Sequence, residues 1–321
     1  MLQDFSGYLV IDELHDGPYT IFYAVDAVAR KRLGFLITRE GATEETARRF
    51  LRQLQKLGPL VVLGVTTDGN PIYPPVLAEV FPGARHQICR FHMLKEINLL
   101  VLRALAQVRK QLRAEPRRRG RRPKRTTRRN RSETAAQKRA RKERQRRAAQ
   151  SRAIWENRFL FVEKHLSTPQ KRRLRGICRG RPELAAVRQL VDLVYGLFDR
   201  RCRTATASKK LQVLRRRKLF QKFPVLEPVC RKLTSPNLDK ALEYLDDDLL
   251  EGTSNAAERA NRRFRKMQKT VYRYRTERMV RARIIFDMLL DYAARSLQPA
   301  PAMLSTWPPL LRWISMSTAA A

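Results

Sequence analysis

The chain has 321 residues, of which 43% are hydrophobic, so it can bury the core of one large domain with an insertion or of two domains. Its 68 basic and 30 acidic residues give a formal net charge of +38, which predicts a polyanionic partner, nucleic acid ahead of an anionic membrane surface. No stretch is typical of a membrane span, a signal peptide or an amphipathic anchor. The four cysteines are widely spaced without a C-x-x-C motif, which predicts reduced thiols in an intracellular protein.

The first part of the chain, residues 7–92, alternates between strand and helix patterns. Residues 39–58 form an amphipathic helix with Thr43 as its expected N-cap, and a second helix is expected at 74–81. The order is three strands, helix, strand, helix, strand, which predicts a mixed sheet with helices on both faces. The strands are predicted at 8–12, 19–26, 33–38, 60–67 and 85–89.

A long helix is predicted from Phe91 to about Arg113, followed by a strongly basic segment. Residues 109–150 contain 20 Lys or Arg and three Glu, a local balance of 20 − 3 = +17. Pro and Gly in its first part predict disorder there, whereas residues 133–147 are compatible with a solvated helix. The segment is either an electrostatic arm without defined geometry or an ordered DNA-binding surface. The side chains expected to contact DNA are Arg117, Arg118, Arg119, Arg121, Arg122, Lys124 and Arg125.

Residues 151–250 return to helical periodicity. Helices are predicted to start at Ser167, Arg181 and Ser235, because each precedes a proline that suits the first helical turn. No strand is predicted in this region, so it is interpreted as an all-helical insertion.

Two hydrophobic stretches each lead to an aspartate: GYLVIDELHDG at 7–17 contains Asp12, and VVLGVTTDGN at 61–70 contains Asp68. Aspartate often terminates strands, so a purely structural role is one interpretation. After the insertion, EGTSNAAERANRRFRK begins at residue 251, and its Thr253 or Ser254 can cap a helix that carries Glu258 in an early turn. Glu258 is either a surface ion-pair partner of the neighbouring arginines or a third metal ligand with the two aspartates.

Four motifs together resemble the DDE transposases of bacterial insertion sequences, in the branch related to eukaryotic Mutator elements. They are Asp12, Asp68-Gly69, the C-x-x-H motif at 89–92, and TSNAAERANR at 253–262. The resemblance implies a ribonuclease H-like α/β core with a large all-helical insertion before the last catalytic helix. The gap from Asp68 to Glu258, 258 − 68 = 190 residues, leaves room for that insertion.

The resemblance also implies a function. Asp12, Asp68 and Glu258 would bind two Mg²⁺ or Mn²⁺ ions, and the enzyme would cleave DNA strands and transfer them, with transposon ends and target DNA as partners. Arg259, Arg262 and Arg263 would contribute to DNA binding. The expected location is the cytoplasm of a bacterium, associated with the nucleoid, without a membrane partner; the oligomeric state, a homo-oligomer included, is left open.

Other candidate residues near these motifs receive structural interpretations. Glu13 is expected to face away from Asp12 if the strand continues, Asp16 to belong to a turn, and Asp26 to precede a hairpin turn. Glu251 is the alternative to Glu258.

The pair Cys89 and His92 cannot complete a tetrahedral zinc site by itself, so packing and positioning near the catalytic face are predicted for it. Only eleven residues precede Asp12, which leaves no room for the N-terminal DNA-binding domain usual in the family. Binding by the basic insertion is therefore expected to be non-specific. A catalytically decayed remnant that binds nucleic acid without cutting, and a structure-dependent nuclease, remain alternative interpretations.

The predicted domains follow from these motifs. They are 1–92 for the first part of the core, 93–250 for the helical insertion with its basic arm at 109–150, 251–297 for the C-terminal helices of the core, and 298–321 for a tail.

Overall fold

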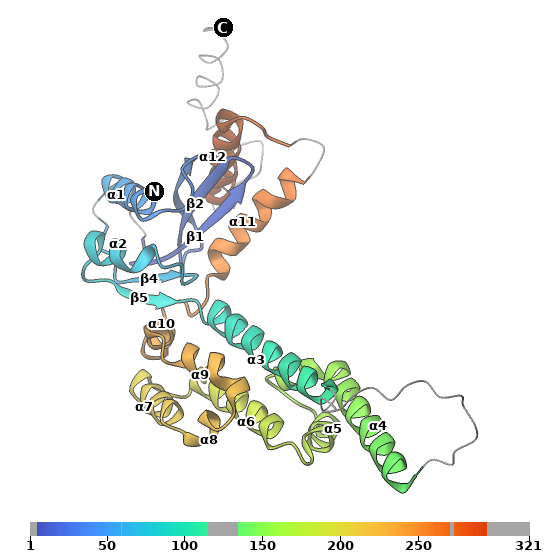
Figure 1. Cartoon of the computed structure of the whole chain (residues 1–321). Helices are drawn as coiled ribbons and strands as arrows, with labels where there is room; N and C mark the ends of the chain where they lie inside the picture. Colours follow the sequence, from blue (N-terminus) through green and yellow to red (C-terminus); the bar gives the residue numbers. More distant parts are fainter. Residues whose placement is uncertain (1–4, 59, 115–133, 270–272, 294–321) are drawn as a thin grey trace. The chain divides into compact units, whose positions relative to one another are not determined.

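The computed structural model describes residues 5–58, 60–114, 134–269 and 273–293 (Figure 1). The chain divides into two compact units, residues 1–89 with 247–321, and residues 90–246. The first contains the sheet and the second is helical. Within the described ranges, no helix is both long and apolar enough to cross a membrane.

The first unit is built on a five-stranded mixed sheet with the strand order β3-β2-β1-β4-β5. β1 pairs with β2 and β2 with β3 in antiparallel fashion, whereas β1–β4 and β4–β5 are parallel. This mixed α/β architecture confirms the predicted fold class and is compatible with a ribonuclease H-like core. The strands are β1 (Tyr8–Asp16), β2 (Tyr19–Asp26), β3 (Arg32–Thr38), β4 (Gly64–Thr67) and β5 (Arg85–Ile88).

Two predicted strand boundaries are wrong. The first strand does not end at Asp12 but continues to Asp16, because β1 and β2 stay paired as far as Asp16 and Tyr19. The fourth strand starts at Gly64 rather than at residue 60, because its partner β1 begins only at Tyr8, which lies opposite Gly64. Asp12 therefore lies within a strand, and before β4 the N–H of Leu63 still donates to the carbonyl of Gly7.

Helices cover both faces of the sheet, as predicted (Figure 1). On one face, Phe22 packs in a core with Phe50 of α1 (Glu44–Lys56) and Tyr73 of α2 (Tyr73–Val80). On the other face, the neighbouring Tyr23 packs with residues of α11 (Asn255–Gln268) and α12 (Glu277–Ala293). The alternation of side chains along β2 thus distributes its residues between two apolar cores.

The predicted turn chemistry is confirmed at two positions. Thr43 caps α1 in a capping box with Thr46. Asp26 is buried at the end of β2, where its carboxylate accepts hydrogen bonds from the main chain of Ser6, Val28 and Ala29. This role is structural, because four donors, including the Ser6 hydroxyl, hold the carboxylate.

The second unit contains only helices among its described residues, as predicted. The basic segment lies partly outside the described residues, but its second half forms an exposed helix, α4 (Ala135–Glu156), capped by Thr134. The expected starts at Ser167, Arg181 and Ser235 are confirmed as N-caps. The elements are α3 (Arg90–Arg113), α4, η1 (Arg158–Phe161), α5 (Thr168–Cys178), α6 (Pro182–Leu197), α7 (Thr204–Arg215), α8 (Lys218–Gln221), η2 (Pro224–Leu226), α9 (Glu227–Leu233), α10 (Pro236–Lys240) and η3 (Glu243–Asp246).

Candidate active site

Two neighbouring parallel strands bring Asp12 and Asp68 together. In the ladder between β1 and β4, Val10 lies opposite Thr66. Asp12 and Asp68 each follow two residues later, so the parallel register places them side by side. This is the juxtaposition that the two sequence stretches predicted.

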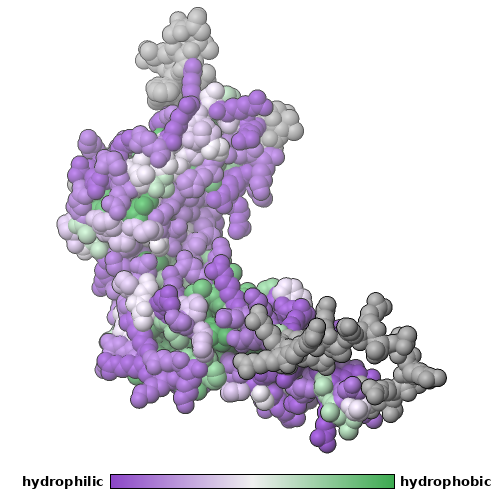
Figure 2. Space-filling view, viewed as in Figure 1, coloured by the Kyte–Doolittle hydropathy of each residue, from purple (hydrophilic) through white to green (hydrophobic). Residues whose placement is uncertain are grey.

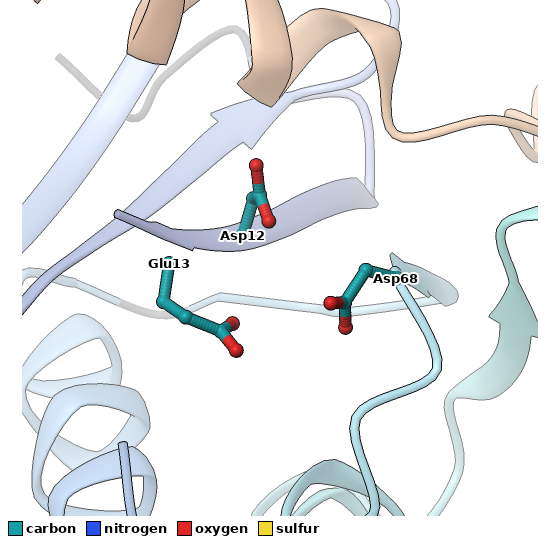
Figure 3. Close-up of side chains that lie close together, drawn as sticks. All are labelled: Asp12, Glu13 and Asp68. Atoms are coloured by element: carbon teal, nitrogen blue, oxygen red, sulfur yellow. The ribbon is translucent and has the colours of Figure 1, made fainter. Parts of the chain in front are cut away.

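Glu13 joins the two aspartates. One carboxylate oxygen from each of Asp12, Glu13 and Asp68 lies within 4.8 Å of the others (Figure 3). The prediction that Glu13 faces away is wrong. Alternation does send its side chain to the opposite side of β1 from Asp12, but Figure 3 shows that the long side chain extends toward Asp68.

Hydrogen bonds fix Glu13 and connect it to Asp68. One carboxylate oxygen of Glu13 accepts from Asn70 Nδ2 at 2.6 Å, and the other accepts from the hydroxyl of Tyr73. The main-chain N–H of Asn70 in turn donates to Asp68 Oδ1 at 2.9 Å. Asn70 and Tyr73 were missed from the sequence, although the Asp-Gly-Asn turn was a signal for Asn70.

Crowding of carboxylates in a buried place shifts their protonation. Burial, together with the smaller effect of the negative charges of Glu13, Asp68 and Glu258, raises the pKa of Asp12 from 3.8 to about 7. Burial also raises the pKa of Glu13, with a contribution from Asp68, while the bonds from Tyr73 and Asn70 oppose the shift. The cluster therefore holds its full negative charge only against a considerable electrostatic cost.

Helix α11, which follows the helical insertion in the sequence, also contributes side chains beside this cluster. Asn261 is buried, and its Nδ2 donates to Asp12 Oδ2 at 2.6 Å. The Oδ1 atom of Asn261 is buried without a hydrogen-bond partner in the described structure. Glu258 lies one turn earlier on α11, and its Oε1 accepts from the hydroxyl of Ser254 at 3.0 Å. Asn261 is thus a third site residue, after Asn70 and Tyr73, that sequence reasoning missed.

Glu258 is near the aspartates but does not belong to the close group. Its charge acts on Asp12, whereas the tight three-carboxylate group of the described residues contains Glu13 instead. Glu251, the alternative third ligand, supplies a main-chain carbonyl that accepts from Thr66 Oγ1 at 2.6 Å. The structure therefore brings Asp12 and Asp68 into contact range and leaves Glu258 at the margin.

The start of α11 is anchored to the sheet. Ser254 occupies the predicted N-cap position, but its hydroxyl bonds Glu258 rather than capping the main chain. The N–H of Ser254 donates to the buried sulfur of Cys89 at 3.3 Å. Cys89 directly follows β5, so this contact links α11 to the sheet edge. His92 lies half-buried in α3, in the other unit.

The predicted DNA-binding residues have different surroundings. Arg259, Arg262 and Arg263 are exposed on α11, and Arg263 pairs with Asp291 of α12 at 2.6 Å. Asp16, expected in a turn, ends β1, where its carboxylate accepts from the side chain of Gln268. The arginines and lysine predicted between 117 and 125 lie outside the described residues.

The donor set fits hard divalent cations. All the gathered side chains offer oxygen, with no thiolate or imidazole among them, and Mg²⁺ and Mn²⁺ prefer such ligands. The unpartnered oxygen of Asn261 adds one more acceptor beside Asp12.

The chain matches the model of a known family. The family model DDE_Tnp_ISL3, described as a transposase, matches residues 9–284, a range that contains Asp12, Asp68 and Glu258. No curated protein matches the chain. The match supports the transposase prediction but not the Mutator-related branch, because the matching family is a different one.

Proposed function

Because the chain belongs to the transposase family DDE_Tnp_ISL3, we propose that it is a DDE transposase catalytic region that cleaves DNA strands and transfers them to a target. The observation that carries this proposal is the meeting of Asp12 and Asp68 on neighbouring parallel strands, within the matched range. Its partner is DNA, both transposon ends and target.

The metal ligands of this proposal are Asp12, Asp68 and Glu258. Two bound Mg²⁺ or Mn²⁺ ions would activate a water or a DNA hydroxyl and stabilise the leaving oxygen. Within the chain, Asn261 orients Asp12 through its hydrogen bond, and Ser254 orients Glu258. Asp12 must lose its proton to act as a ligand, so metal binding would release protons below about pH 7.

Glu13 and Glu258 compete for the third ligand position, and their hydrogen bonds favour Glu258. Both oxygens of Glu13 accept bonds, from Asn70 and Tyr73, whereas Glu258 has one such bond, from Ser254. An oxygen without a donor is available to a cation. We therefore assign Glu13 to positioning, because through Asn70 it fixes the carboxylate of Asp68.

Asp68→Asn is expected to abolish metal-dependent nicking of supercoiled DNA. The change keeps the size of the side chain but removes a ligand charge, and its effect should exceed the roughly 10–100-fold losses typical of outer-shell partners. The measurement is nicking with and without Mg²⁺. Asp248→Asn, the same chemical change at an exposed position of the same unit, is the matched control and should nick like the wild type.

A protein that binds nucleic acid without cutting is the alternative function. It is favoured by one observation, namely that Glu258 lies outside the close carboxylate group. The Asp68→Asn experiment separates the two, because a binding protein shows no metal-dependent nicking in the wild type either.

DNA binding is expected to be largely non-specific and strongly dependent on salt. The excess of basic residues predicts contacts to phosphates, and with six to ten such contacts the affinity should fall by roughly 10³ to 10⁵ between 50 and 200 mM salt. Fluorescence anisotropy with two unrelated duplexes measures this. A large preference for one duplex, or an affinity that does not change with salt, would contradict the prediction.

A further inference from the structure

Two arginines of the helical unit lie over the ring of one tryptophan, and a third is bonded to the same helix as that tryptophan. The guanidinium carbon of Arg109, on α3, lies 4.4 Å from the ring centre of Trp155, on α4. That of Arg158, in η1, lies 3.9 Å from the same ring centre. Arg113, one turn after Arg109, is tied to α4 as well, through Ser151 Oγ at 3.0 Å.

Hydrogen bonds fix these guanidinium groups without using up their donors. Arg109 Nε donates to the carbonyl of Ser151 at 3.1 Å, and Arg158 Nη1 donates to the carbonyl of Trp155 at 2.8 Å. Each arginine has five N–H donors in a rigid fork, so most remain available for an outside acceptor. Stacking on the indole ring restricts the guanidinium planes further. The groups are therefore held in place before any ligand arrives.

The charges of the three arginines are not balanced by nearby acids. Within the described parts of the chain, no carboxylate forms a salt bridge with Arg109, Arg113 or Arg158, although many other arginines of the protein are paired in this way. Burial lowers the pKa of Arg109, and the positive charges of Arg113 and Arg158 add to that effect. Bringing three cations together has an electrostatic cost that a bound anion would remove.

The aromatic residues of this cluster remain open to solvent. Trp155 is 48% exposed and Phe159, whose ring centre lies 4.3 Å from the Arg158 guanidinium carbon, is 56% exposed. The guanidinium groups that lie over these exposed rings are therefore held at the surface of the unit. The rest of α4 continues the positive surface, and Figure 2 shows that hydrophilic residues dominate the visible face of the molecule. The exposed cations of α4 include Lys138, Arg139, Lys142, Arg146 and Arg152.

We propose that the arginine–tryptophan cluster, formed by Arg109, Arg113, Trp155, Arg158 and Phe159, binds the phosphodiester backbone of duplex DNA. The inference rests on the proposed function for the identity of the polyanion. Guanidinium forks match phosphate oxygens, and a row of fixed forks suits a ligand with phosphates in series. An anionic membrane fits less well, because α4 buries only Ser151 and Ile154 and exposes no continuous apolar face.

The test measures DNA affinity of the full chain across a range of salt concentrations. Arg109→Gln and Arg158→Gln should each make the negative slope of log affinity against log salt shallower by about 0.9, and the double variant by about 1.8. Arg231→Gln is the matched control, since it removes the same charge in the same unit from an exposed arginine paired with Glu227 at 2.5 Å. Its slope should stay at the wild-type value. Circular dichroism and thermal melting verify that the variants fold.

A second measurement does not depend on removing a packed side chain. A photoreactive benzoyl-phenylalanine in place of the exposed Phe159 should crosslink to a bound duplex. The inference is overturned if the double variant keeps the wild-type salt slope, or if the probe at position 159 fails to crosslink while the protein binds DNA. If the arginine variants lose binding to phosphatidylserine vesicles but bind DNA like the wild type, the cluster is a membrane-binding surface instead.

These outcomes are separate from those of the proposed function. A reduced salt slope in the arginine variants, together with a wild-type protein that does not nick DNA, would support the cluster and refute the transposase chemistry. An unchanged slope, together with nicking that Asp68→Asn abolishes, would refute the role of the cluster and support the transposase chemistry.

Discussion

Glu258→Gln is expected to abolish metal-dependent nicking while preserving or strengthening metal-free DNA binding. Without metal, the carboxylates near Asp12 repel one another and repel phosphate, so removal of one charge lessens that cost. With Mg²⁺ present, the same change removes a ligand that the two-metal arrangement requires. Nicking and filter binding are measured on the same preparation, with thermal melting as the folding control.

Glu13→Gln is the informative comparison with Glu258→Gln, because it makes the same chemical change on β1, next to Asp12. If Glu13 positions Asp68 through Asn70, its variant should lose only about 10–100-fold in activity. If Glu258 is an exposed ion-pair partner, its variant should nick at the wild-type rate and lose at most about 1 kcal/mol of stability. In that case Glu13 or Glu251 becomes the third ligand.

Asp12→Asn is expected to stabilise the metal-free protein at neutral and alkaline pH while abolishing nicking. The pKa of Asp12 is raised in the folded state from 3.8 to about 7, so the folded protein binds this proton more tightly than the unfolded chain. The wild type therefore loses stability as the pH rises from about 4 to 7, and below pH 4 the contribution vanishes because both states are protonated. At about 1.36 kcal/mol per unit, the cost above pH 7 is at most about 4 kcal/mol. Asparagine carries no charge, so the variant does not have this loss of stability.

Denaturant unfolding of both proteins at pH 5 and pH 8, without metal, measures this effect. The variant's advantage should be larger at pH 8, and Mg²⁺ should stabilise the wild type more than the variant, because only the wild type retains the ligand. Asp248→Asn, at an exposed position, should follow the wild type. An advantage that is equal at both pH values would show that packing, rather than charge, explains it.

The sequence was most informative where local pattern and topology agree. The strand that contains Asp12 and the strand that precedes Asp68 were recognisable as apolar runs, and the family resemblance implied that these two strands are neighbours, as their ladder shows. Thr43, Asp26 and the proline-marked helix starts follow from capping and turn chemistry within a few residues. The solvated helix predicted at 133–147 is confirmed in α4.

What could not be predicted depends on side-chain reach and on distant pairing. Alternation places Glu13 on the far side of β1, and only its length and its bonds to Asn70 and Tyr73 return its carboxylate to Asp68. The contact between Asn261 and Asp12 joins residues 249 positions apart, and no local pattern encodes it. The start of β4 depends on where its partner β1 begins, which is a property of the ladder rather than of the strand.

The covering of one sheet face by α11 and α12 has a consequence for the order of events during synthesis. Leu14, Ile21 and Tyr23 are made early, but the helices that bury them follow the whole insertion. At about 5–20 residues per second, the ribosome needs roughly 10–30 s to make residues 90–246, and meanwhile this apolar face lacks its native cover. During that interval the nascent chain exposes apolar surface of the kind that chaperones bind. Since Glu258 and Asn261 arrive on the same late helix, the chain acquires its proposed cutting site only when that face closes.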